Sequence, residues 1–275
     1  MTSKTILITG SSSGIGLASA RLLAAQGHEI WLLNRNPEKS AAAVTSIKNV
    51  VPDARLHEVK LDLNKLASVK LAAQQLLQLS RIDVLINNAG GLTDRRYVTQ
   101  DGFEQQFQQN HLGHFALTST LMPLLLSSKA TIINVSSEAH RMGRINFDDL
   151  QGEKSYNAFG RYAEVKLMNI LFTKGLHQRF HKHGLNIYAL HPGVVNTRFG
   201  EGLGGNSWMW KLMSPFLISP DKGAATTVYL ATQGQAMQSG LYFKKKKPST
   251  PSRTALHQAT ADRLWEVSEQ LLQNR

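Results

Sequence analysis

Tyr162 and Lys166, four positions apart, are the side chains in this sequence best suited to move a proton. On a helix this spacing places both groups on one face. A tyrosine phenol has an ordinary pKa of about 10, and a neighbouring ammonium group lowers that pKa because it stabilises the phenolate. We therefore expect Tyr162 to exchange protons near neutral pH with Lys166 beside it. Tyr156 is excluded from this role, because the residue four positions later is Gly160.

A pair of serines offers a hydroxyl group for the same chemistry. Ser136 and Ser137 follow the apolar run at 130–135 and should lie on the loop after a strand. A hydroxyl in that place can donate a hydrogen bond to an oxygen on which negative charge develops. Ordinary structural roles compete with these assignments, since Tyr and Lys at helical spacing often form a surface pair and adjacent serines often form a turn.

A glycine-rich segment at 9–16 predicts a nucleotide site. It follows the apolar run at 6–8 and opens a helical pattern. In this strand-turn-helix context Gly10 permits a tight turn, Gly14 permits close approach of a diphosphate, and Gly16 permits packing of the helix on the strand. Such spacing also arises by chance, so the turn alone is weak evidence.

The elements that must position these residues follow an alternating pattern. Apolar runs of strand length are separated by amphipathic helical segments, which indicates βαβ units and a parallel sheet. The expected strands are Thr5–Thr9, Glu29–Asn34, Arg55–Leu61, Val84–Asn87, Ala130–Val135, Leu185–His191 and Gly240–Phe243, and the helical patterns lie near 15–26, 37–49, 64–80, 101–127, 155–182 and 221–233. No linker or repeat divides this pattern, so we expect one α/β domain over residues 1–275, with a doubly wound, seven-stranded parallel sheet flanked by helices.

Composition and charge exclude several other classes of protein. The chain has 275 residues, 31 Lys and Arg against 19 Asp and Glu, and no cysteine, so it has no disulfides and no thiol chemistry. Its basic residues are spread along the chain without interleaved aromatic residues, which argues against a nucleic-acid partner. The run Lys244–Lys247 predicts a solvated loop, with weak peripheral contact to anionic lipid as the alternative.

Location and metal content follow from what the sequence lacks. The first strand begins at Thr5, which leaves no room for a signal peptide, and no apolar stretch reaches the length of a membrane span. We therefore expect a soluble, cytoplasmic protein. His111 and His114 could share a helix face, but no third ligand is evident, so we expect no metal site.

These motifs, together with Asn87-Asn88-Ala89-Gly90, resemble those of the short-chain dehydrogenase/reductase family, and most closely its retinol-dehydrogenase-like branch. The segments 143–145, 150–154, 169–173 and 263–268 resemble that branch as well. The resemblance covers nearly the whole chain and implies a Rossmann fold and an NAD(P)-dependent oxidoreductase. Many animal relatives carry an N-terminal membrane anchor, so the start of this chain suggests a bacterial or otherwise soluble member.

The resemblance also implies roles for four catalytic residues. Tyr162 would be the general acid in reduction and the general base in oxidation, and Lys166 would also hold the nicotinamide ribose. Ser137, preferred to Ser136 because the family's serine usually stands second in such a pair, would bind the substrate oxygen. Asn110 would support a water-mediated proton relay from the lysine.

The implied dinucleotide contacts are spread over the whole length of the chain. They are Gly10, Ser12, Ser13, Gly14, Ile15 and Gly16 for the diphosphate and adenosine ribose, Asn34 and Arg35 at the second strand, Asp62 and Leu63 for the adenine, Asn87, Ala89 and Gly90 after the fourth strand, Tyr162 and Lys166, and Pro192, Gly193, Val194 and Thr197 beside the nicotinamide. Asn87, Ala89 and Gly90 could equally support the sheet.

The end of the second strand discriminates between the two nicotinamide cofactors. An acidic residue there would bind the ribose 2′-hydroxyl of NAD and repel the 2′-phosphate of NADP. This chain has Asn34 and Arg35 instead, and a guanidinium pairs well with phosphate. We therefore expect NADP(H) to be preferred, with NAD(H) possible.

Residues 198–219 break the alternating pattern. They combine glycines with large apolar side chains, among them Trp208 and Trp210, and predict a lid over an apolar substrate, with packed surface helices as the alternative. We expect an NADP-dependent enzyme that interconverts a lipophilic carbonyl compound, of retinal or steroid type, and its alcohol. The alternative is a catalytically idle dinucleotide-binding sensor. The resemblance implies a homodimer or homotetramer, with a monomer as the alternative, since some members of the branch are monomeric.

Overall fold

The computed structural model describes residues 2–193 and 218–273, and the strands of these residues form one sheet. Their order across the sheet is β3-β2-β1-β4-β5-β6-β7-β8. The strands are β1 Thr5–Thr9, β2 Glu29–Asn34, β3 Arg55–Lys60, β4 Val84–Asn87, β5 Thr131–Val135, β6 Asn186–His191, β7 Tyr242–Lys244 and β8 Lys247–Pro248. The order reverses between β1 and β4, which confirms a doubly wound sheet and places a crevice at the carboxyl ends of these two strands.

The sheet has eight strands instead of the seven that the sequence predicts. Strands β1 to β7 are parallel, and β8 pairs antiparallel with β7. The hairpin between β7 and β8 turns at Lys245 and Lys246, whose φ angles are 51° and 61°. Both values lie in the left-handed region that two-residue hairpin turns require. This turn is not evident from the sequence, because asparagine and glycine are its usual signals and the chain has four consecutive lysines here.

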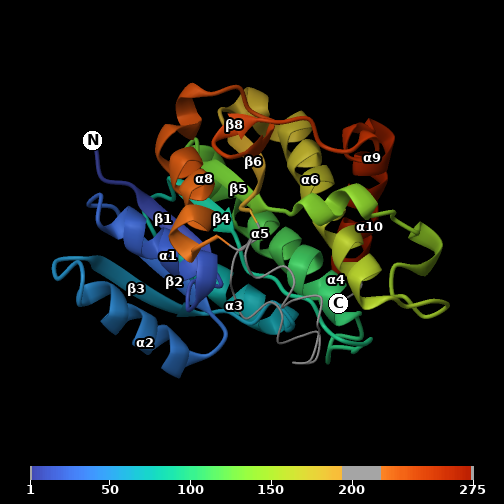
Figure 1. Ribbon diagram of the computed structural model, residues 1–275, viewed down its shortest axis with the longest axis horizontal. Helices are drawn as coiled ribbons and strands as arrows, with labels where there is room; N and C mark the ends of the chain where they lie inside the picture. The colour runs from blue at the N-terminus through green and yellow to red at the C-terminus, as the bar shows by residue number, and fades with distance from the viewer. Residues whose placement is uncertain (1, 194–217, 274–275) are drawn as a thin grey trace.

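Helices cover both faces of the sheet (Figure 1). They are α1 Gly14–Ala24, α2 Pro37–Lys48, α3 Leu66–Leu76, α4 Gln105–Phe107, α5 Gly113–Ser127, α6 Ala158–Phe180, α8 Pro220–Gln233, α9 Arg253–Leu256 and α10 Gln258–Gln273. In β1, Leu7 packs in one core cluster with residues of α3, α5 and α6, whereas Ile6 and Ile8 pack in another with residues of α1, α2 and α8. The full burial of all three explains why a parallel strand reads as a continuous apolar run.

Two helical regions differ from the expected pattern. The helix expected at 101–127 is divided into α4, a π-helical segment Gln108–Leu112 and α5. The C-terminal helix α10, which packs along α6 (Figure 1), was not among the expected elements. Its signal is present in the sequence, since Ala261, Leu264, Trp265 and Ser268 follow helical spacing and are buried. None of the helices in the described parts of the chain is both long and apolar enough to cross a membrane.

Candidate active site

A cleft of about 850 Å³ lies at the carboxyl end of the sheet. Most of the predicted cofactor residues line it, namely Gly10, Ser12, Ser13, Gly14, Ile15, Gly16, Asn34, Arg35, Asp62, Leu63, Ala89, Gly90, Tyr162, Lys166 and Pro192. Gly193 follows Pro192 with a φ of 101°. Val194, Thr197 and all of the predicted lid except Ile218 and Ser219 lie outside the described residues. The cleft therefore collects predicted contacts from strands that are far apart in the sequence.

The glycine turn has the geometry that a bound diphosphate needs. The φ angles of Gly10 and Gly14 are 65° and 55°, values that residues with a side chain rarely adopt. A Cβ atom on Gly16 would lie 2.2 Å from the carbonyl oxygen of Gly10. Helix α1 begins at Gly14. In the described part of the chain, the side chain of its N-cap residue Ser13 makes no hydrogen bond to the first turn of the helix. Its first N–H groups are thus available to an anion.

Asn88, which the sequence analysis did not single out, holds the glycine turn in place. Its Nδ2 donates to the carbonyl oxygens of Thr9 and Gly10 at 2.8 and 3.2 Å, and its side chain lines the cleft. Asn87, the preceding residue, was the one predicted to contact the cofactor. It is not among the described residues that line the cleft. Its Nδ2 instead donates to Asn134 Oδ1 at 2.8 Å and so ties β4 to β5. The alternation of side chains along a strand separates the two residues.

The end of β2 carries more positive charge than the sequence analysis assigned to it. Arg35 is exposed and lines the cleft, as does Lys39 one helical turn later. Asn36 caps α2 by accepting a hydrogen bond from the Lys39 backbone at 2.7 Å. The side chain of Asn34, by contrast, is held by Ser11 and Ser40. The signal that could have identified Lys39 is its position in the first turn of the helix that follows β2.

Tyr162 and Lys166 lie together on α6, as their spacing predicts, and both are at least 90% buried. The Nζ atom of Lys166 lies 5.5 Å from the centre of the Tyr162 ring and donates to the carbonyl oxygen of Val135 at 3.3 Å. Burial lowers the pKa of Lys166 to about 8. Helix α6 is started by Asn157, whose side chain accepts from the Gly160 backbone at 2.7 Å.

The pKa of Tyr162 differs from the sequence-based expectation. Burial raises this pKa above its ordinary value, and a hydrogen bond from Ser137 acts in the opposite direction but is weaker. The expectation of a lowered pKa considered the charge of Lys166 and left out the desolvation of the phenolate. In a buried site the loss of hydration disfavours the charged form, and here it is the larger effect.

The structure distinguishes the two serines. The Oγ atom of Ser136 donates to the carbonyl oxygen of Lys166 at 2.6 Å and is therefore engaged with the backbone of α6. Ser137 is the serine whose side chain bonds to Tyr162, and its Oγ also accepts from the Ala139 backbone at 3.2 Å. Although Ser137 is not among the residues that line the cleft, it adjoins the cleft through Tyr162.

Asn110 lies in the π-helical segment and is fully buried. Its amide exchanges two hydrogen bonds of 3.1 Å with the backbone of Gly91, and its Nδ2 also donates to Gln106 O at 2.9 Å. A Cβ atom on Gly90 would lie 2.3 Å from Asn110 Oδ1 and 3.2 Å from Lys166 Nζ. Asn110 and Lys166 therefore both lie close to Gly90, and a π-helical turn at such a place is typical of functional sites.

The two histidines of this helix have separate partners. Nε2 of His114 lies 2.9 Å from Thr9 Oγ1 beneath the glycine turn. Nε2 of His111 lies 2.9 Å from Ser268 Oγ on α10. Burial lowers the pKa of His111 to about 3 and that of His114 to about 4. Both therefore act as neutral residues of the core.

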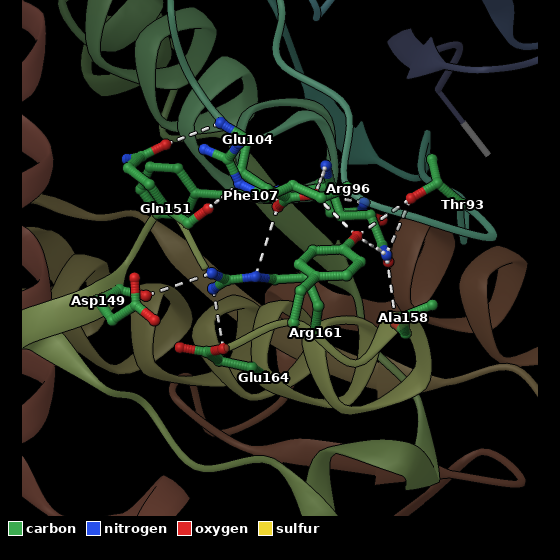
Figure 2. A network of polar contacts seen from close by, with 12 residues as sticks. Thr93, Arg96, Glu104, Phe107, Asp149, Gln151, Ala158, Arg161 and Glu164 are labelled. Atoms are coloured by element: carbon green, nitrogen blue, oxygen red, sulfur yellow. Dashed lines mark hydrogen bonds and ion pairs between the residues drawn. The ribbon is translucent and has the colours of Figure 1, made fainter. Parts of the chain in front are cut away.

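A buried charged network surrounds Arg161 near the start of α6 (Figure 2). Arg161 lies between two carboxylates, with Nη1 2.8 Å from Glu164 Oε2 and Nε 3.5 Å from Glu104 Oε2. Glu104 also accepts from the Tyr156 hydroxyl at 3.1 Å and from the Phe107 backbone at 2.8 Å. Burial raises the pKa of Glu164 to about 7, although Arg161 opposes this effect. This network was not predicted from the sequence. The i,i+3 spacing of Arg161 and Glu164 on α6 is the sequence feature that could have indicated part of it.

Both the sequence and the structure match known proteins. A family model described as short chain dehydrogenase matches residues 4–205. Retinol dehydrogenase 11 of Homo sapiens is 39% identical over 272 residues, which cover 98% of this chain and 86% of that protein. A crystal structure of an uncharacterized protein from Mycobacterium Paratuberculosis has a TM-score of 0.80 at 34% identity, with 98% of this chain and 92% of that chain covered.

A more distant structure shares the fold. It is a 3-ketoacyl-(acyl-carrier-protein) reductase from Brucella melitensis, complexed with NADH, with a TM-score of 0.69 at 21% identity. The match covers 87% of this chain and 95% of that chain. At this identity the likeness concerns the arrangement of strands and helices, not the individual side chains of the site.

Proposed function

The chain belongs to the short-chain dehydrogenase/reductase family as an NAD(P)-dependent oxidoreductase, and we propose that it interconverts a lipophilic carbonyl compound and its alcohol with NADP(H) as the preferred cofactor. The observation that carries the proposal is the meeting of Tyr162 and Lys166 at a cleft that begins with a glycine turn, with Ser137 next to Tyr162. A dinucleotide-binding module would need the glycine turn but not the proton donor.

The residues of the cleft fit a dinucleotide. The narrow approach at Gly16, which a Cβ atom would block, and the free start of α1 suit the diphosphate. Arg35 and Lys39 place two cations in the cleft at the end of β2, where the described lining residues of this stretch include no carboxylate, and would bind a 2′-phosphate. When bound, the cofactor supplies or accepts the hydride. The protein must then handle the proton.

Tyr162 is the group that handles this proton. In reduction its hydroxyl gives a proton to the carbonyl oxygen of the substrate, and in oxidation the phenolate takes a proton from the alcohol. Ser137, already bonded to Tyr162, stabilises the oxygen as negative charge develops on it. Lys166 stabilises the phenolate, and Asn110 supports proton exchange with solvent. The raised pKa of Tyr162 keeps its proton in place until the reaction requires it.

A lipophilic substrate is favoured by the relatives and by two exposed side chains. Retinol dehydrogenase 11 is named for a lipophilic alcohol. Near the start of α6, Phe159 is 43% exposed and its ring centre lies 6.4 Å from that of Tyr162. Met142, in the segment after Ser137, is 63% exposed. An exposed aromatic ring next to a residue that lines the cleft, such as Phe159 beside Tyr162, suits the binding of an apolar substrate.

The test combines cofactor binding with turnover. Fluorescence titration with NADPH and NADH should give tighter binding of NADPH, and a panel of lipophilic aldehydes that includes retinal should be reduced with the tighter cofactor. Binding of NADPH without turnover of any panel member would favour the idle sensor. Failure to bind either cofactor would contradict the proposal as a whole.

A further inference from the structure

The segment that follows Ser137 is tied to the C-terminal part of the chain. It forms a short 3₁₀ helix, Glu138–Met142. Glu138 accepts hydrogen bonds from the Tyr242 hydroxyl at 2.9 Å and from Lys244 Nζ at 3.1 Å. Arg141 donates from Nη2 to the carbonyl oxygen of Thr250 at 2.8 Å. The hairpin β7–β8 and the loop after it therefore form the support on which this helix lies.

His140, fully buried in this segment, bridges the same loop to Ser137. Its Nδ1 lies 2.6 Å from the carbonyl oxygen of Ser137, and its Nε2 lies 3.1 Å from the backbone nitrogen of Ser252. A carbonyl oxygen only accepts and a backbone N–H only donates. The proton must therefore be on Nδ1, so His140 is a neutral imidazole in a single tautomer. Burial, the largest effect, lowers the pKa of His140 and favours this neutral form.

Ser137 needs such an anchor because of what its side chain does. Its hydroxyl bonds to Tyr162 and, in the proposed reaction, to the substrate oxygen. Its Oγ also accepts from the Ala139 backbone, but that contact lies within the same segment and does not tie the segment to the C-terminal loop. A displacement of about 1 Å at a reacting group can lower a rate by about 100-fold.

We propose that His140 is a positioning residue for Ser137, and that Glu138, held by Lys244, supports the same segment from the C-terminal hairpin. This inference rests on the proposed function, because Ser137 must act on the substrate oxygen. It also explains one lysine of the run Lys244–Lys247: Lys244 is an ion-pair partner of Glu138, whereas Lys247 is exposed.

Two substitutions of His140 separate its two hydrogen bonds. The amide nitrogen of asparagine can take the place of Nδ1, so H140N keeps the bond to Ser137 and loses the bond to Ser252. The amide of glutamine reaches the place of Nε2, so H140Q has the opposite effect. We expect H140Q to lower kcat by about 10- to 100-fold and H140N by no more than about 3-fold, with NADPH binding, measured by fluorescence, the same in both.

A residue that only packs in the core would behave differently. Both variants would then lose kcat to a similar degree, in parallel with a fall in Tm, and that result would overturn the inference. Unchanged kcat in H140Q would overturn it as well. The control S137A distinguishes a failure of the proposed function from a failure of the positioning role of His140. Full activity of S137A would contradict the role of Ser137 in the proposed function, whereas loss of activity in S137A with an intact H140Q would contradict the positioning role alone.

A second pair of variants tests the inference even where H140Q does not fold. K244M removes one of the partners of Glu138, and K247M makes the same change in charge at the exposed residue that pairs with Lys244 across the hairpin. We expect K244M to lower kcat by about 3- to 10-fold without a change in NADPH binding, and K247M to match the wild type. Equal kcat values for the two variants would overturn the supporting role of Lys244.

Discussion

Helix α6 presents two polar surfaces that are built on different principles. Toward the cleft it carries Tyr162 and Lys166, both buried and both with pKa values that are shifted chiefly by burial. Away from the cleft it carries Arg161 and Glu164, which join Glu104 in an ion-pair network (Figure 2). The network satisfies its charges within the protein, whereas the cleft pair keeps its chemistry available. Two polar pairs on one helix are thus similarly buried, but one is paired with charges inside the protein and the other lines the cleft, where we propose that it reacts.

The largest expected effect distinguishes Tyr162, which lines the cleft, from Tyr156, which belongs to the ion-pair network. Y162F removes the proton donor and should lower kcat by about 100-fold or more. Y156F removes a hydroxyl of the network and should keep kcat within about 3-fold, while it lowers the free energy of unfolding by about 1 kcal/mol. Steady-state kinetics and urea unfolding of both variants measure the difference. Full turnover by Y162F would exclude Tyr162 as the proton donor.

Arg161 provides the corresponding test from the network side. R161M leaves two carboxylates buried without their cation and should lower the free energy of unfolding by about 3 kcal/mol or more. R144M, which changes an exposed arginine, should have an effect of about 0.5 kcal/mol or less. NADPH binding by folded R161M should resemble that of the wild type. Equal stabilities of the two variants would show that the network contributes nothing to folding.

Charge reversal at the end of β2 should change the choice of cofactor. R35D should lower the ratio of kcat/KM for NADPH to that for NADH by about 10-fold or more, since it repels the 2′-phosphate and offers an acceptor to the ribose hydroxyl. K48D makes the same change in the exposed last turn of α2, away from the cleft, and should leave the ratio unaltered. An unchanged ratio in R35D would remove Arg35 from the specificity argument.

The smallest expected effect is a pH dependence of stability. Burial raises the pKa of Glu164 from 4.5 to about 7, so between these values the folded state binds more protons than the unfolded state. This group therefore makes the protein less stable as pH rises through that window. E164Q should flatten that slope in thermal unfolding measured from pH 5 to 7, whereas E153Q, at an exposed position, should not. An unaltered slope in E164Q would show that Glu164 titrates normally.

Local spacing in the sequence determined much of the fold and part of the site. The strands β1, β2 and β4 have the bounds that their apolar runs predict. The glycine turn and the shared face of Tyr162 and Lys166 also follow from spacing. In each case the deciding contacts lie within a few residues of one another, and strand and helix periodicity are local properties of the chain.

Only the tertiary structure decided which polar groups meet and how strongly each is buried. Glu104 and Tyr156 are 52 positions apart and His140 and Ser252 are 112 apart, so no local period connects them. The different hydrogen-bond partners of Ser136 and Ser137, the separate directions of Asn87 and Asn88, and the raised pKa of Tyr162 depend in the same way on what surrounds each side chain in space. Residue type sets what a group can do, but desolvation and hydrogen-bond partners come from segments that folding brings together.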